Sequence, residues 1–166
     1  YVLVERRAEV KKLAAFARSE SRLALLNSHY QDYPEFRPFL GDVRDERRLR
    51  EACDGMDIVI HAAALKRVDG GAYNPLEMHK TNVQGSINVA EAARSCGVKK
   101  VILISSDKAV APINTYGASK YQAENCLREL NSYSAPKGTR ISCVRYGNVL
   151  ASTGSVLTIW AKQKSN

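Results

Sequence analysis

Two residues near the middle of the sequence, Tyr116 and Lys120, have the types and spacing needed for proton transfer. They are four positions apart, so on a helix they share one face, with about 5–6 Å between their Cβ atoms. An ammonium group at that distance favours the phenolate and lowers the tyrosine pKa from its reference of about 10. Such a phenol can act as a general base near neutral pH. The pair also occurs by chance, and an exposed helix pair is the alternative interpretation.

The segments around the pair favour the chemical interpretation. An apolar run at 101–104 is followed by Ser-Ser-Asp-Lys at 105–108, and one loop later comes Tyr116. Parallel strands deliver functional side chains at their carboxyl ends, where the loops face the ligand crevice of an open α/β sheet. We therefore predict that Asp107 and Lys108 lie in one crevice with Tyr116 and form part of the same active site.

The composition is typical of one soluble globular domain. The chain has 166 residues, of which 45% are hydrophobic and 25% charged. No run approaches the roughly 18 apolar residues of a membrane span, and the charged first residues do not form a secretory signal. The 4 cysteines are scattered singly, without a C-x-x-C pair or a histidine cluster. They predict a cytoplasmic protein with reduced thiols, without a disulfide framework and without a metal site.

The net charge of +8 raises the question of nucleic-acid binding. The basic residues are spread along the chain, without the stripe or aromatic neighbours of a nucleic-acid surface. We therefore expect neither a nucleic-acid nor a membrane partner. A basic surface is compatible with a phosphate-rich cofactor and a nucleotide-linked substrate.

Strand-like and helix-like segments alternate along the chain. Strands are expected at 10–17, 36–40, 57–64, 98–105 and 139–145. Helices are expected at 1–8, 19–30, 45–55, 75–95, 116–131 and 155–164. This alternation predicts an α/β fold with a doubly wound parallel sheet. The continuous apolar run 57–64 is typical of a strand that is buried on both faces.

One Rossmann feature does not occur in the sequence. In that fold a first strand and a glycine-rich turn lead into a helix whose N-terminus holds the pyrophosphate of a dinucleotide. No G-x-x-G-x-x-G precedes residue 10. The Rossmann order would place that strand between the strands 10–17 and 57–64. We expect the sequence to begin inside the helix that follows this strand.

The Ser-Ser-Asp-Lys segment and the Tyr116 and Lys120 pair resemble the active site of the extended short-chain dehydrogenase/reductases. Further segments resemble the inverting UDP-N-acetylglucosamine 4,6-dehydratases of the polysaccharide-biosynthesis group: GDVRD, HAAALK, YNPLE, KTN, SSDKA, NTYGASK and RYGNV. The resemblance implies a Rossmann-like fold, with residues 1–166 forming a partial NADP-binding domain that stops before the family's substrate lobe. Two departures lie in the loop beside the sugar site. Arg67 stands where the subfamily has His, and 69–72 are Asp-Gly-Gly-Ala in place of Pro-Ile-Ala-Glu.

The resemblance also assigns cofactor contacts. It implies that Asp42 and Val43 lie against the adenine, although a strand-to-helix turn capped by Asp42 is the alternative. It implies that three small residues, Ala62, Ala63 and Ala64, let the backbone approach the ribose and diphosphate. Tyr116 and Lys120 complete this set.

The identity of the cofactor depends on the end of the strand 10–17. An acidic residue at this point of a Rossmann fold binds the ribose of NAD, whereas an arginine accommodates the 2′-phosphate of NADP. Arg18 and Ser19 stand here, without an acidic residue in the last position of the strand. NADP is therefore the expected cofactor, with a merely solvated Arg18 as the alternative.

The catalytic roles follow from the resemblance. Tyr116, assisted by Lys120, removes the 4-hydroxyl proton while hydride passes from C4 to NADP. Lys108 then removes the C5 proton, Asp107 protonates the departing C6 hydroxyl, and hydride returns to C6 with inversion at C5. These two roles need a neutral amine beside a protonated carboxyl, and burial shifts both pKa values in the required directions.

The remaining expectations concern substrate and partners. Lys66, Asn148 and Val149 match substrate-binding segments, and the substrate is UDP-N-acetylglucosamine or a related UDP-hexosamine. His61 is expected to be structural, and Asn82 to support the catalytic lysine through hydrogen bonding. Relatives commonly pair through the helices that carry Asn82 and Tyr116, so a homo-oligomer is expected. The alternatives are a UDP-sugar 4-epimerase and a non-catalytic Rossmann nucleotide-binding protein.

Overall fold

The computed structural model describes residues 9–66 and 73–149. Its strands are β1 (Leu13–Ala17), β2 (Phe36–Leu40), β3 (Ile58–His61), β4 (Lys100–Ile104) and β5 (Arg140–Val144). Its α-helices are α2 (Glu20–His29), α3 (Glu46–Cys53), α5 (Pro75–His79), α6 (Gly85–Ser95) and α7 (Thr115–Ser134). A π-helical turn, Lys80–Gln84, joins α5 to α6, and 3-10 turns lie at Asp107–Ala109 and Ala135–Lys137. The predicted helices 1–8 and 155–164 lie outside the described residues.

Short polar side chains decide where three of the helices begin. Ser19, Asp45 and Asn114 each stand one position before a helix and accept a hydrogen bond from a backbone N–H in its first turn. Such caps satisfy donors that have no partner inside the helix. Gly97, just after the C-terminal end of α6, has φ +72. Glycine adopts this conformation without strain, and it commonly ends helices.

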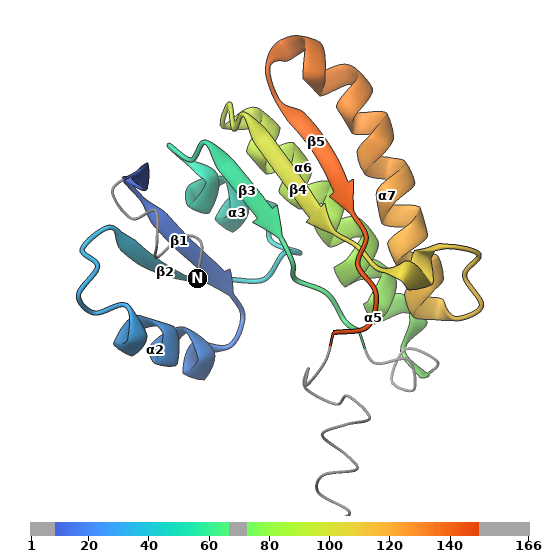
Figure 1. The fold of residues 1–166 in the computed structure, drawn as a ribbon, viewed down its shortest axis with the longest axis horizontal. Coiled ribbons are helices and arrows are strands. Elements are labelled where there is room, and N and C mark those ends of the chain that lie inside the picture. The colour runs from blue at the N-terminus through green and yellow to red at the C-terminus, as the bar shows by residue number, and fades with distance from the viewer. Residues whose placement is uncertain (1–8, 67–72, 150–166) are drawn as a thin grey trace, which may run out of the picture.

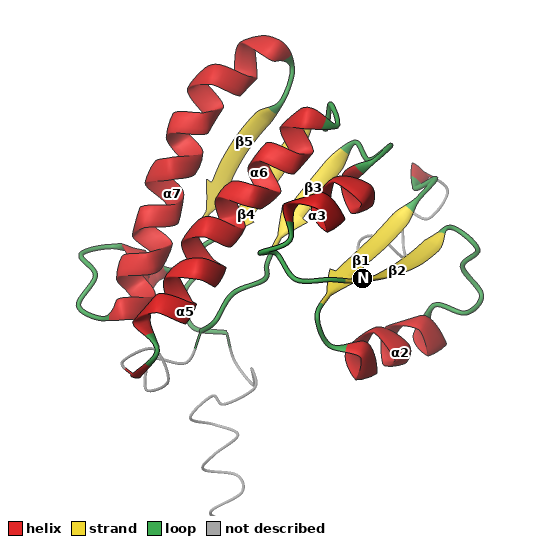
Figure 2. Ribbon diagram, turned by 180° about the vertical axis from the view of Figure 1, so that it is seen from behind, coloured by secondary structure: helices red, strands yellow, loops and turns green. Residues whose placement is uncertain are grey.

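All described strand pairs are parallel, as predicted, but they form two sheets. β1 pairs with β2, and β3, β4 and β5 form a second sheet in that order. β1 lies between β2 and β3 in both views, with no ladder from β1 to β3 among the described residues (Figures 1 and 2). The open edges of β1 and β3 are thus the two between which the Rossmann order places one further strand.

Helices cover one face of the larger sheet. α3, α6 and α7 lie together on that face (Figure 2), and the core between them contains Val101, Leu103 and Ile141 from the strands. Along each strand, the side chains at alternate positions point to the opposite face of the sheet. On that face, Ile58 and Ile60 of β3 are 54% and 58% exposed. The prediction that the run 57–64 is buried on both faces is therefore wrong, because no described helix covers that second face.

Two predicted boundaries change in ways that affect the site. The strand expected at 57–64 ends at His61, so the alanines that follow lie in a loop after β3. The helix expected at 75–95 forms without interruption but contains the π-helical turn. A π-turn inserts an extra residue into the helix and is frequent at functional sites.

Candidate active site

Predicted catalytic and substrate-binding residues meet at the carboxyl ends of β4 and β5. Asp107 and Lys108 lie in the 3-10 turn after β4, and the Asp107 N–H donates to the Tyr146 carbonyl at 3.0 Å. Lys108 Nζ donates to Asp107 Oδ1 at 3.2 Å and to Asn148 Oδ1 at 3.3 Å. The segment after β5 therefore lies against the turn that carries the Asp–Lys pair.

Tyr116 lies in the first turn of α7, which packs on the same 3-10 turn. Its side chain is mostly buried, and the residue is 8% exposed. Burial raises the pKa of Tyr116, a hydrogen bond with Ser106 lowers it in part, and Tyr146 and Asp107 raise it further. The pKa is thus higher than usual, contrary to the predicted lowering by Lys120, because burial removes the water that would solvate the phenolate.

Lys120 is among the largest fully buried side chains, with 2% of its surface exposed. Burial lowers the pKa of Lys120 to about 8, an effect that is opposed by the negative charge of Glu124 and, to a smaller extent, by Cys143. Its Nζ is not among the buried polar atoms that lack a hydrogen-bond partner in the described residues. A buried ammonium is costly unless it is paired or solvated, and this cost is the reason why burial lowers the pKa of Lys120.

Asp107 and Lys108 are in a more open environment than their predicted roles require. Their side chains are 48% and 39% exposed and form an ion pair. Hydrogen bonds from Ser106 and Lys108 hold the pKa of Asp107 below its usual value. The carboxylate is therefore ionised near neutral pH, contrary to the protonated acid that the predicted mechanism needs. Exclusion of water by a bound substrate would shift this pKa upward.

Gly117 lets α7 approach this turn closely. A Cβ atom at Gly117 would stand 2.1 Å from the Lys108 carbonyl oxygen and 3.1 Å from Pro112 Cβ. Backbone cannot yield as a flexible side chain can, so Gly117→Ala should displace the 3-10 turn. We expect a loss of about 1–3 kcal/mol in the free energy of unfolding, measured by chemical denaturation.

Gly147 offers the matched control for this prediction. Apart from its chain neighbours, no atom of the described residues lies within 4 Å of a Cβ placed there, and its φ is not in the left-handed region. We expect Gly147→Ala to change the free energy of unfolding by less than about 0.5 kcal/mol. Equal effects of the two substitutions would show that the close approach at Gly117 does not matter.

A buried polar network beneath the site was not predicted from the sequence. Asn82, in the π-turn, binds the Leu65 N–H and carbonyl at 2.8 and 2.9 Å and donates to Ser119 Oγ at 3.0 Å. Ser86 Oγ donates to the Asn82 carbonyl (2.6 Å) and lies 3.0 Å from His61 Nε2. Asn82 therefore binds Ser119, the residue before Lys120, and not Lys120 itself as predicted.

His61 has the structural role that was predicted. It is 4% exposed, and burial lowers its pKa to about 4, with a further contribution from Lys120. The imidazole is therefore neutral near pH 7. Because the Ser86 hydroxyl donates its proton to Asn82, His61 Nε2 acts as the donor in the bond between them. The i, i+4 spacing of Asn82 and Ser86 is the one sequence signal of this network.

The residues predicted to select the cofactor lie at the carboxyl ends of β1 and β2. Arg18 Nη1 and Asp42 Oδ2 approach to 3.9 Å. Ser19 Oγ accepts a hydrogen bond from the Arg22 N–H at 3.4 Å and caps α2. A helix N-terminus next to an arginine is a favourable environment for a phosphate group.

The other predicted cofactor residues are arranged differently. Val43 is 7% exposed and part of the hydrophobic core, and a Cβ added to Gly85 would stand 2.7 Å from its Cγ2. Its side chain therefore packs inside the protein, against Gly85. The alanines at 62–64 follow β3, between His61 and the Leu65 backbone that Asn82 binds.

The predicted substrate residues are only partly brought together. Asn148 contacts Lys108, which places it in the site. Val149 follows it and is 54% exposed. Lys66 directly follows Leu65, and Asn82 binds the Leu65 backbone. The backbone next to Lys66 is therefore fixed by hydrogen bonds.

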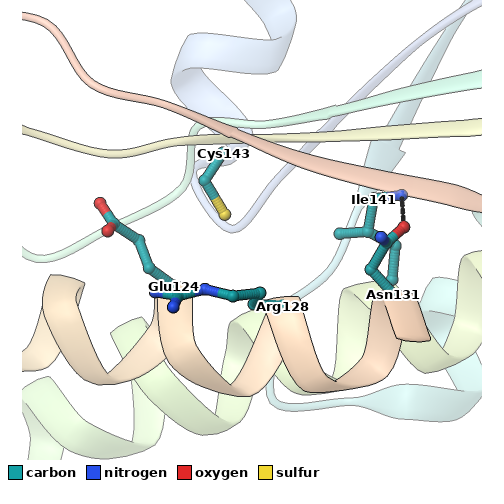
Figure 3. Close-up of a pocket in the computed structure, with 5 residues that line it drawn as sticks. All are labelled: Glu124, Arg128, Asn131, Ile141 and Cys143. Carbon is teal, nitrogen blue, oxygen red and sulfur yellow. Dashed lines mark hydrogen bonds between the residues drawn. The ribbon is translucent and has the colours of Figure 1, made fainter. Parts of the chain in front are cut away.

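A cavity of about 170 Å³ lies elsewhere, between α7 and the edge of β5 (Figure 3). It is lined by Glu124, Arg128, Asn131, Ile141 and Cys143. None of the predicted catalytic residues lines it, so we assign the chemistry to the convergent side chains and not to this cavity. In the described parts of the chain, no three His, Cys, Asp or Glu residues are arranged to hold a metal ion.

Comparison with known proteins shows the family to which the chain belongs. The model of the family described as "Polysaccharide biosynthesis protein" matches residues 3–166. The chain belongs to this polysaccharide biosynthesis family. An inverting UDP-N-acetylglucosamine 4,6-dehydratase of Campylobacter jejuni is 42% identical over 151 residues, covering 91% of this chain and 45% of that protein. A UDP-glucose 4-epimerase of Rickettsia massiliae is 39% identical over 155 residues, covering 93% and 45%.

A solved structure shows that the fold is shared. The structure of Pen from Bacillus thuringiensis superposes with a TM-score of 0.89 at 37% identity, covering 94% of this chain and 48% of that one. The predicted Rossmann-like α/β fold is thus confirmed. This member of the polysaccharide biosynthesis family spans about half the length of the relatives it matches. Among its described helices, none combines the length and the apolar character needed to span a membrane.

Proposed function

We propose that the protein is an NADP-dependent nucleotide-sugar 4,6-dehydratase that acts on UDP-N-acetylglucosamine or a related UDP-hexosamine and inverts C5. The observation that carries the proposal is the convergence of Tyr116 and Lys120 with the Asp107–Lys108 ion pair at the ends of β4 and β5. The 42% identity to a dehydratase of this type supports the choice of reaction.

The residues present fit a dinucleotide. The Lys120 side chain is 2% exposed and follows Tyr116 by one turn of α7, and its ammonium would donate to ribose hydroxyls. Arg18 and the capped N-terminus of α2 offer positive charge and N–H groups for a phosphate. NADP would supply reversible acceptance of hydride. Tyr116 would take the 4-hydroxyl proton as its phenolate, which burial makes the minor form of this side chain.

The Asp–Lys pair would carry out elimination. Oxidation at C4 makes the neighbouring C5 hydrogen acidic, and Lys108 would remove it as a neutral amine. Asp107 would give a proton to the C6 hydroxyl, which leaves as water. In the open site the pair is ionised. Proton transfer from Lys108 to Asp107 on closure would produce the amine and the acid together, because burial disfavours both charges.

The choice of NADP over NAD predicts the effect of Arg18→Ala. Loss of a charge-assisted hydrogen bond to phosphate should weaken NADPH binding about tenfold or more, while NADH binding changes little. Fluorescence titration of the full-length protein with both cofactors measures this ratio. Arg47→Ala is the matched control, because Arg47 is 92% exposed on α3. A similar loss of NADH affinity would show that Arg18 does not read the 2′-phosphate.

A UDP-sugar 4-epimerase is the second candidate, because epimerases are similar over the same residues. Incubation of the full-length protein with UDP-N-acetylglucosamine in D₂O separates the two reactions. A dehydratase loses water and introduces deuterium at C5, visible by mass spectrometry and NMR. An epimerase yields a sugar of unchanged mass without deuterium at C5.

The remaining features of the proposal concern the whole protein. We propose a cytoplasmic homo-oligomer of which residues 1–166 form a partial NADP-binding domain. α7 exposes Tyr121 and Tyr133, and these aromatic residues suit a contact between copies. α6 is largely buried within the chain itself, so α7 would contribute most of such a contact. Light scattering of the full-length protein tests this assembly.

A further inference from the structure

An ion pair between the buried Glu124 and the exposed Arg145 lies next to Lys120 and has no part in the reaction proposed above. Glu124 follows Lys120 by one turn of α7 and is 5% exposed. Its carboxylate accepts hydrogen bonds from Arg145 Nε at 3.0 Å and Arg145 Nη2 at 2.6 Å. The Ser105 hydroxyl donates to its Oε1. Because Ser105 follows β4 and Arg145 follows β5, this one carboxylate ties α7 to both strand ends at the site.

The charges around Lys120 make Glu124 its principal anionic neighbour among the described residues. On a helix, side chains four positions apart have Cβ atoms about 5–6 Å from each other. His61 on β3 is neutral near pH 7. Burial raises the pKa of Cys143 on β5, which keeps its thiol protonated. Tyr116 on the same helix is also protonated, since its pKa is raised by burial.

The neighbouring 3-10 turn and the partner of Glu124 complete this environment. Asp107 in that turn forms an ion pair with Lys108, and its charge contributes to the raised pKa of Tyr116. The charge of Glu124 itself is partly balanced by Arg145, whose hydrogen bonds, with that of Ser105, lower the pKa of Glu124 despite its burial. The electrostatic potential at Lys120 therefore depends on how far the positive charge of Arg145 offsets the negative charge of Glu124.

We propose that Glu124 is a positioning residue that supplies the counter-charge for the buried Lys120 ammonium, and that Arg145 limits how much of this charge Lys120 experiences. The catalytic meaning of this inference rests on the proposed function. Its effect on Lys120 rests on the position of Glu124 one turn after Lys120 on α7 and on the contacts of Glu124 with Arg145 and Ser105.

Two substitutions should shift the titration of Lys120 in opposite directions. Glu124→Gln removes the anion while keeping size and hydrogen bonding, so Lys120 should lose its proton at a lower pH. Arg145→Gln leaves Glu124 without its neutralising partner, so Lys120 should lose its proton at a higher pH. We expect about one pH unit in each direction. The double substitution should return the titration toward that of the unchanged protein.

The titration can be read without any activity, by ¹³C NMR of the lysine Cε carbons in the full-length protein, with the Lys120 signal assigned through Lys120→Arg. Glu129→Gln is the matched control, because Glu129 lies on α7 but is exposed. Glu129→Gln should leave the pH at which Lys120 loses its proton unchanged. Arg145→Lys keeps the cation and should also leave this pH unchanged, even if the loss of the bidentate contact lowers thermal stability.

The kinetic counterpart is the pH dependence of the first hydride transfer. The ratio of the rate at about pH 8.5 to the rate at pH 7 is the quantity to compare with the unchanged protein. This ratio should be about fivefold lower in Glu124→Gln and higher in Arg145→Gln. Shifts of Lys120 in the same direction for both variants, or no shift in Glu124→Gln, would overturn the inference. Opposite NMR shifts in a protein that does not oxidise the sugar would retain the inference and reject the proposed function.

Discussion

Tyr116→Phe should reduce the first hydride transfer about 10³-fold, since a positioned general base contributes about 10²–10⁴-fold. The substitution removes the phenol oxygen that would take the 4-hydroxyl proton and leaves the ring in its buried position. Water loss should disappear together with oxidation, because elimination requires the 4-keto group. Single-turnover formation of NADPH with UDP-N-acetylglucosamine, followed by absorbance in the full-length protein, measures the first step.

Tyr121→Phe is the matched control, because Tyr121 lies on the same helix and is 46% exposed. It should retain the rate of the unchanged protein. A loss of less than tenfold in Tyr116→Phe, with the cofactor still bound, would mean that another group takes the proton.

Lys108→Ala should separate oxidation from elimination. The first hydride transfer should proceed within a few-fold of its normal rate, because Tyr116 and Lys120 remain. Removal of the C5 proton should fall about 10²–10⁴-fold, so that the 4-keto sugar accumulates without deuterium at C5 in D₂O. Mass spectrometry of quenched reactions distinguishes this product from the dehydrated one.

The matched control for this experiment is Lys99→Ala, since Lys99 is 74% exposed and forms an ion pair with Asp57 at the far end of the sheet. It should leave both steps unchanged. Normal deuterium incorporation in Lys108→Ala would place the C5 base elsewhere. Loss of the first hydride transfer instead would show that Lys108 positions the substrate or the Tyr116 turn.

The sequence by itself determined the class of fold and the order of the elements. Apolar runs act over a few residues, so the strand at 36–40 could be recognised locally. The helix after this strand is capped by Asp45 and not by Asp42, the alternative considered from the sequence. The spacing of Tyr116 and Lys120 likewise guaranteed that they share a helix face. Their pairing with Asp107 and Lys108 followed from the carboxyl ends of parallel strands.

Only the tertiary structure decided the electrostatics of the site. The pKa of Tyr116 is raised and not lowered, because burial depends on packing that no local spacing encodes. Glu124 and Arg145 are 21 positions apart, and nothing in either neighbourhood indicates that they pair. Burial and charge pairing arise from contacts distant in sequence, whereas helix faces and caps arise from neighbours along the chain. Local sequence patterns therefore predict the candidate catalytic residues, whereas only the fold sets their protonation.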